Sequence, residues 1–120
     1  ANKQSSFTRT NTPVPFTMKQ NDTSPAVQAT LQDGEGVAVD LTGSTVRFHM
    51  VNAADGTVKI DGPTVITEPT NGIVWYHWLT GDTDTSGTFY VEFEVTYPSG
   101  SIETFPNNKD LTVIVKPELS

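Results

Sequence analysis

The two histidines, His49 and His77, are the side chains of this sequence best suited to proton transfer or metal binding near neutral pH. Both lie within stretches that read as β-strands. Their imidazoles can approach each other only if the two strands are neighbours, and no spacing signals a third ligand. The sequence therefore predicts no metal site, no cofactor and no catalytic histidine.

Two pairs of carboxylates were weighed as further candidates for chemistry. Asp82 and Asp84, in the stretch GDTDTSG, are spaced like part of a calcium loop, but the remaining ligands and the glycine of that loop are not in register. We expect these two side chains to cap a turn. Glu92 and Glu94 lie on one strand, where a flat sheet face offers no cleft for a sugar. With no nucleophile motif or phosphate loop present, the sequence predicts that the protein is not an enzyme.

Aromatic side chains offer a different chemistry, because an exposed ring can stack on a sugar or anchor a protein interface. Trp75 and Trp78 are three residues apart, so in a strand they must face opposite sides. We expect Trp78 to point into the core and Trp75 to lie outside it, beside His77. Tyr90 is the other aromatic residue expected on an outer face.

These side chains are positioned by strands, because period-two alternation runs through the chain from residue 14 to its end. The clearest strand, 88–97, places Phe89, Val91, Phe93 and Val95 on one face and Tyr90 on the other. Asp55-Gly56 and Asn71-Gly72 are hairpin turn signals. We expect an immunoglobulin-like β-sandwich of about seven to nine antiparallel strands. Its expected strand segments are 14–20, 26–32, 45–52, 57–60, 64–67, 73–79, 88–97, 101–105 and 111–116, and 37–41 is expected as a short extended piece that crosses between the sheets.

The composition limits the classes of partner. The chain has 120 residues, which suits one domain, and its formal net charge is −7 with only seven Lys and Arg residues. Such a surface opposes binding to nucleic acid and to an anionic membrane. Cysteine is absent, which excludes disulfides and favours synthesis in a reducing compartment. Because no apolar run is long enough for a signal peptide or a membrane span, we expect a complete chain made in the cytoplasm.

The first 13 residues differ from the rest, since they are polar and contain Phe7 as their only large apolar residue. They also hold two of the cationic residues, Lys3 and Arg9. We expect residues 1–13 to form a flexible N-terminal arm that docks on a neighbouring subunit, and residues 14–120 to form the sandwich.

Several short motifs occur together in an order that is typical of one family. They are Asp40-Leu41-Thr42-Gly43 followed by Val46-x-Phe48-x-Met50, Gly72 with Tyr76 and Trp78, Asp82-x-Asp84-x-x-Gly87-x-Phe89, and Thr104-Phe105-Pro106. Over residues 16–116 the sequence resembles the immunoglobulin-like domain at the N-terminus of baseplate upper proteins of tailed bacteriophages. Family members often carry Tyr where this chain has Phe89, so the corner hydrogen bond from that hydroxyl is not expected here.

The resemblance implies a non-enzymatic structural protein of the virion, a single module that binds capsid, neck, tail or baseplate proteins and is present in several copies or as a homo-oligomer. The alternative is a carbohydrate-binding or host-adhesion module that uses Trp75 or Tyr90. The residues expected to contact partners are Lys3, Phe7, Arg9, Arg47, His49, Trp75, His77 and Tyr90.

Overall fold

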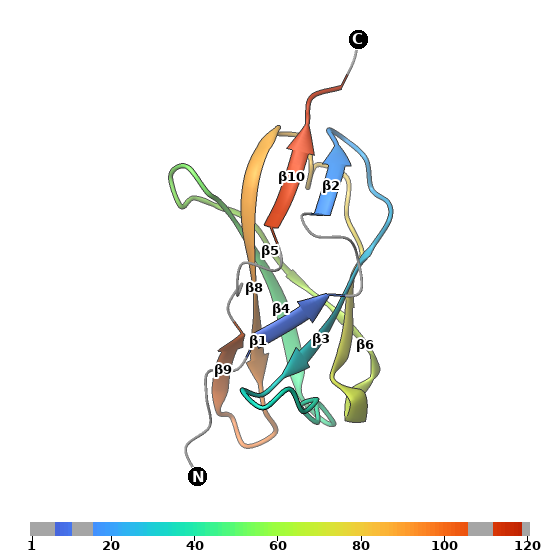
Figure 1. Ribbon diagram of the computed structural model, residues 1–120, viewed down its shortest axis with the longest axis vertical. Coiled ribbons are helices and arrows are strands. Elements are labelled where there is room, and N and C mark those ends of the chain that lie inside the picture. Colours follow the sequence, from blue (N-terminus) through green and yellow to red (C-terminus); the bar gives the residue numbers. More distant parts are fainter. Residues whose placement is uncertain (1–6, 11–15, 106–111, 119–120) are drawn as a thin grey trace.

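The computed structural model describes residues 7–10, 16–105 and 112–118, and in these ranges the chain is built from strands and one short 3-10 turn (Figure 1). No helix in the described ranges is long and apolar enough to cross a membrane. The elements are β1 (Phe7–Thr10), β2 (Phe16–Lys19), β3 (Val27–Gln32), β4 (Thr45–Asn52), β5 (Val58–Pro63), β6 (Val65–Glu68), η1 (Pro69–Asn71), β7 (Ile73–Tyr76), β8 (Gly87–Thr96), β9 (Ile102–Phe105) and β10 (Thr112–Lys116).

The strands form two sheets that pack face to face. One sheet has four strands in the order β1-β3-β7-β6, and the other has six, in the order β2-β10-β8-β4-β5 with β9 also paired to β8. β2 and β10 are parallel and lie side by side in Figure 1, whereas the other described pairs are antiparallel. The predicted all-β sandwich is confirmed.

The core between the sheets follows the alternation that the sequence predicts. Every second residue of β3, β4 and β8 is buried, because successive side chains of a strand point to opposite faces of its sheet. Phe48 lies at the centre, with its ring stacked on Tyr76 at a centroid distance of 4.0 Å. Trp78 is buried as expected, and its indole N–H donates to the carbonyl of Pro25 at 3.0 Å.

The expected strand segments 57–60 and 64–67 leave Asp61-Gly62-Pro63 outside any strand, which is wrong, because these three residues form the end of β5. Gly62 does not form a turn. Its lack of a side chain lets the Tyr76 ring pack close to the backbone, since a Cβ at this position would lie 3.3 Å from the ring. The chain changes sheets only after Pro63, so β5 and β6 are edge strands of different sheets.

Part of the expected N-terminal arm also differs from the prediction. Residues 7–10 form β1, whose backbone pairs with β3 from Phe7 opposite Gln32 to Thr10 opposite Ala29. The first sheet therefore begins before the boundary expected at residue 14. The physical reason is that the free edge of β3 offers a row of backbone donors and acceptors, which even a polar segment can satisfy. Lys3 lies outside the described residues.

The loop after β7 is held by a carboxylate, as the capping prediction requires. Asp82 accepts a hydrogen bond from the backbone N–H of Leu79 at 2.8 Å and another from the hydroxyl of Tyr76. Burial and this bond to a carboxylate raise the pKa of Tyr76, so its hydroxyl remains a donor. The strand expected over 73–79 ends earlier, at Tyr76, and the turn held by Asp82 follows at Leu79.

Candidate interaction faces

The outer face of the six-stranded sheet brings Arg47 and His49 together around a residue that the sequence analysis did not single out. Arg47 Nε lies 2.8 Å from Asp61 Oδ1, and its Nη2 donates to the Asp61 carbonyl at 2.9 Å. His49 Nε2 lies 3.0 Å from the same carboxylate oxygen. The hydrogen bond from Arg47 is the main cause that holds the pKa of Asp61 below its usual value.

Cross-strand register explains this cluster and extends it to β8. His49 lies between Asp61 on β5 and Glu92 on β8, and Arg47 is opposite Glu94. Side chains that are directly opposite on one face are close enough to interact. Arg47 and His49, two of the residues expected to contact a partner, are therefore flanked by acidic neighbours within the same chain.

Replacing Arg47 with alanine is expected to raise the pKa of Asp61 towards the ordinary carboxyl range, because the largest cause of its lowered value is removed. Lys59→Ala is the matched control, since Lys59 Nζ lies 2.5 Å from Asp84 and its hydrogen bond lowers the pKa of that carboxyl instead. NMR titration of the two side-chain carboxyl carbons measures both values. An Asp61 titration that does not move in Arg47→Ala would contradict the pairing.

The lowered pKa of Asp61 also determines how this side chain affects the stability of the fold as the pH changes. The pKa of Asp61 is lower in the folded protein than its ordinary value, so the carboxylate favours folding at neutral pH. This contribution is lost as the pH falls through the folded-state pKa. Because both partners are about half exposed, we expect the ion pair to position the side chains more than it stabilises the fold.

The outer face of the four-stranded sheet, here called the four-strand face, has a different character. Its described residues come from the three neighbouring strands β3, β7 and β6, and Glu68, opposite Ile73, is the one charged residue among them. The carboxylate of Glu68, at the end of β6, accepts a hydrogen bond from the Asn71 side chain of η1. The described residues of the four-strand face are Gln28, Thr30, Gln32, Val65, Glu68, Ile73 and Trp75.

Trp75 and His77 lie together at this face, as the sequence predicts. Their rings are stacked with centroids 6.2 Å apart and planes inclined by 13°. The half-buried indole is thus partly covered by the imidazole, which leaves less of its ring open to a sugar. Arg9 of β1 is opposite Thr30 in the register, so the segment that contains Phe7 and Arg9 borders this face.

The predicted contact residues do not form one site. β4 and β8 carry Arg47, His49 and Tyr90 in one sheet, whereas β7 precedes His77 and carries Trp75 in the other. His49 lies on β4 and His77 follows β7 of the other sheet, so the two histidines are not on neighbouring strands. In the part of the chain that the structure describes, no group of three or more His, Asp or Glu residues could hold a metal ion.

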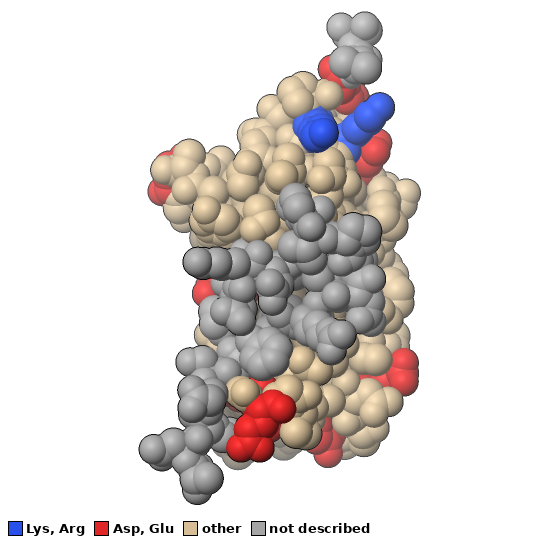
Figure 2. All heavy atoms as spheres, in the orientation of Figure 1, with Lys and Arg blue, Asp and Glu red and all other residues tan. Residues whose placement is uncertain are grey.

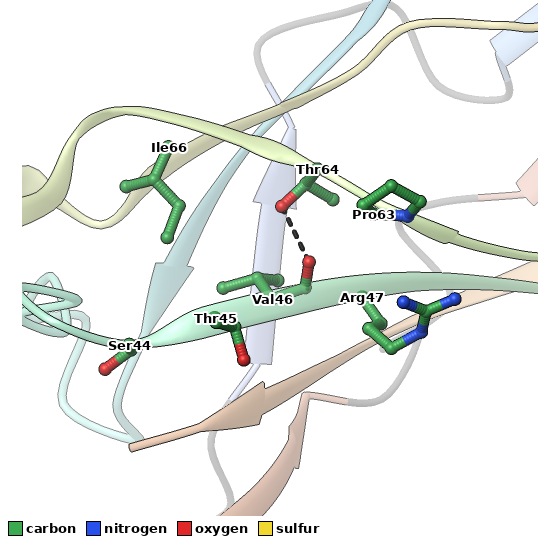
Figure 3. A pocket seen from close by; sticks show the side chains of 7 residues that line it. All are labelled: Ser44, Thr45, Val46, Arg47, Pro63, Thr64 and Ile66. Carbon is green, nitrogen blue, oxygen red and sulfur yellow. Dashed lines mark hydrogen bonds between the residues drawn. The ribbon is translucent and has the colours of Figure 1, made fainter. Parts of the chain in front are cut away.

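A notch of about 410 Å³ lies where the chain passes from β5 to β6 (Figure 3). Thr64 closes one side, with its backbone N–H and its hydroxyl both donating to the carbonyl of Val46 at 3.2 Å and 2.9 Å. Figure 3 shows the side chains of Val46, from β4, and Ile66, from β6, lying between these two strands. Ser44 also lines the notch, and its buried hydroxyl has no hydrogen-bond partner among the described residues. The notch therefore lies where the chain crosses from the six-stranded sheet to the four-stranded sheet.

Charge is unevenly distributed over the side of the molecule drawn in Figure 2. Lys and Arg side chains gather at one end of this view, over β2 and β10, and Asp and Glu lie around its rim. Lys19 and Lys116 are register partners at the ends of these two strands. This positive charge is therefore concentrated at the ends of β2 and β10, although the formal net charge of the chain is −7.

These features define an all-β, immunoglobulin-like sandwich with two outer faces of different character. The chain belongs to the baseplate upper protein N-terminal domain family, described as the BppU N-terminal domain, which matches residues 3–119. The suspected family is therefore confirmed, and the match includes β1 as well as the sandwich beyond it. Membership implies a structural component of a bacteriophage virion.

Two solved structures are similar to this chain, and the one with the higher TM-score shows the same fold in a distant protein. CopC from Methylosinus trichosporium OB3b is 14% identical, with a TM-score of 0.55, over 96% of this chain and 97% of that chain. Murine CRIg is 11% identical, with a TM-score of 0.46, over 93% of this chain and 98% of that chain. No curated protein matches the sequence. The likeness to CopC concerns the fold alone.

Proposed function

We propose that this chain is a non-enzymatic structural module of the virion, which binds another virion protein through the four-strand face. The observation that carries this proposal is the low charge of that face, whose described residues include Trp75 and the exposed Val65 but only one of the chain's 14 acidic residues, Glu68. Capsid, neck, tail and baseplate proteins are the candidate partners, and several copies are expected on each particle.

The chemistry of the face suits a protein interface. Interface cores are depleted of charged side chains and enriched in aromatic ones, and here Trp75 lies beside Val65, which is 51% exposed. A partner that covers carboxylates must desolvate them, which is costly. Glu68 is the one described carboxylate of the four-strand face and lies at the end of β6, so a partner that covers Val65 and Trp75 need not desolvate several carboxylates.

Placing a carboxylate on the four-strand face tests this proposal. Val65→Glu is expected to reduce incorporation into particles at least tenfold, because burying an unpaired charge at an interface costs more than about 1.4 kcal/mol. Ile102→Glu is the matched control, since Ile102 is also an exposed aliphatic residue of a strand, 63% exposed, but belongs to the other sheet. It is expected to leave incorporation unchanged.

The measurement is complementation of a phage that lacks this chain, followed by quantitative immunoblotting of purified particles. Thermal unfolding of both variants checks that each remains folded. Equal incorporation of Val65→Glu and wild-type protein would exclude the four-strand face as the interface. Absence of the wild-type chain from purified particles would overturn the virion function itself.

A further inference from the structure

A shallow hollow of about 530 Å³ lies beside Tyr90, between the loop that joins β4 to β5 and the start of β8. Tyr90 is 47% exposed, and Thr88 lies on the same face of β8 because the two residues are two positions apart. The volume is within the usual range for small-molecule sites. The lining residues are Asn52, Ala53, Ala54, Ser86, Gly87, Thr88 and Tyr90.

Backbone hydrogen bonds fix the shape of the hollow. The N–H of Ala53 donates to the carbonyl of Thr88 at 2.9 Å, which ties the loop to β8. The Asn52 side chain accepts from the N–H of Ala54 at 2.8 Å, and the Asn52 N–H donates to Thr57 across the turn. Because both walls are held in this way, a ligand need not order the loop when it binds.

The chemistry of the lining is uniform, since no residue of the hollow carries a charge. Ser86 and Thr88 offer hydroxyls, each both a donor and an acceptor, and Asn52 offers an amide. Tyr90 adds a flat apolar ring with a polar end. An aromatic platform ringed by hydroxyl and amide groups matches a ligand that has one apolar face and many hydroxyls.

We propose that this hollow binds a neutral saccharide, with one sugar ring stacked on Tyr90 and its hydroxyls hydrogen-bonded to Ser86, Thr88 and Asn52. An acidic sugar fits less well, because the hollow contains no cation and the chain carries a formal net charge of −7. A protein partner needs roughly 800 Å² of surface on each side, whereas the hollow is a small concavity. This inference does not depend on the proposed virion function.

The purified full-length chain is to be tested on an array of neutral oligosaccharides built from glucose, galactose, N-acetylglucosamine and rhamnose. The strongest probe is then titrated by NMR. Tyr90→Ala is expected to weaken its binding roughly tenfold, the loss expected from removing one stacked ring. Tyr90→Phe keeps the ring, and we expect it to retain most of the affinity. Trp75→Ala alters the opposite sheet and is expected to leave the affinity unchanged.

Three outcomes would overturn the inference. One is that none of the neutral oligosaccharides binds the wild-type chain. Another is that a probe binds wild-type protein and Tyr90→Ala equally well, with thermal unfolding showing that the variant is folded. The third is that Tyr90→Ala reduces incorporation into particles while no saccharide binds, which would make the hollow a protein-docking surface. None of these outcomes bears on whether Val65→Glu blocks assembly.

Discussion

Gly72→Ala is expected to lower the free energy of unfolding by about 3 kcal/mol or more. Gly72 has a φ of +68° where the chain leaves η1 for β7, a conformation that costs other residues about 1–2 kcal/mol. The added Cβ would also lie 2.7 Å from the carbonyl oxygen of Leu31 and 3.0 Å from that of Val39. Both atoms belong to the backbone and cannot rotate away.

The same backbone is needed for hydrogen bonding, which is why relief of the overlap is costly. The N–H of Leu31 donates to the carbonyl of Gly72 at 2.9 Å, and the N–H of Val39 donates to the carbonyl of Leu31 at 2.9 Å. Moving Gly72 away from Leu31 would stretch the first of these bonds. The expected loss is therefore larger than the conformational strain alone.

Gly36→Ala separates the two causes. Gly36 has a φ of +82°, but its Cβ would meet nothing within 4 Å, so only the strain of about 1–2 kcal/mol applies. Urea unfolding of both variants, followed by tryptophan fluorescence, gives the two free energies. Equal losses would mean that the backbone around Gly72 relaxes freely and that the close approach to Leu31 is unimportant.

Alternation identified the inward residues because burial in this fold repeats with the period of the strand. Phe48 and Phe93 are both buried where the pattern places them. Trp75 and Trp78 also separate as their spacing requires, one at the outer face and the other in the core. The direction of each of these side chains depends only on its position within one strand, so it can be predicted from the sequence.

What the sequence did not reveal depends on segments that are far apart. The glycine of Asp61-Gly62-Pro63 signals a turn unless Tyr76 of the other sheet is known to lie against Gly62. The meeting of Asp61 with Arg47 depends on the register of the β4–β5 hairpin, which a bulge between Met50 and Val51 shifts. The pairing of β1 similarly depends on the free edge of β3.

The two proposed binding surfaces face away from each other, since they belong to the outer sides of different sheets with the core between them. A virion protein bound at Val65 and Trp75 would therefore leave the hollow at Tyr90 open. A module anchored in this way can bind a saccharide without releasing its partner. Measuring saccharide binding by assembled particles, with Tyr90→Ala particles as the control, tests this independence.

Phe48→Ala is expected to have the largest effect of the substitutions considered, a loss of about 3–5 kcal/mol in the free energy of unfolding. Phe48 is fully buried, and beyond its stacking on Tyr76 its ring packs edge-on against Phe93 at 5.5 Å and Trp78 at 5.8 Å. Deleting the ring leaves a cavity between the sheets. Such a loss is a large share of the 5–15 kcal/mol by which most domains are stable.

Phe48→Leu refills much of that volume and provides the matched control, with an expected loss of roughly 1–2 kcal/mol. Urea unfolding measures both variants, and near-ultraviolet circular dichroism reports the packing of Tyr76 and Trp78. If Phe48→Ala cost no more than Phe48→Leu, the aromatic cluster would not be the centre of the core. A larger loss for alanine, accompanied by a weaker aromatic signal, would show that this cluster holds the two sheets, and hence both outer faces, in place.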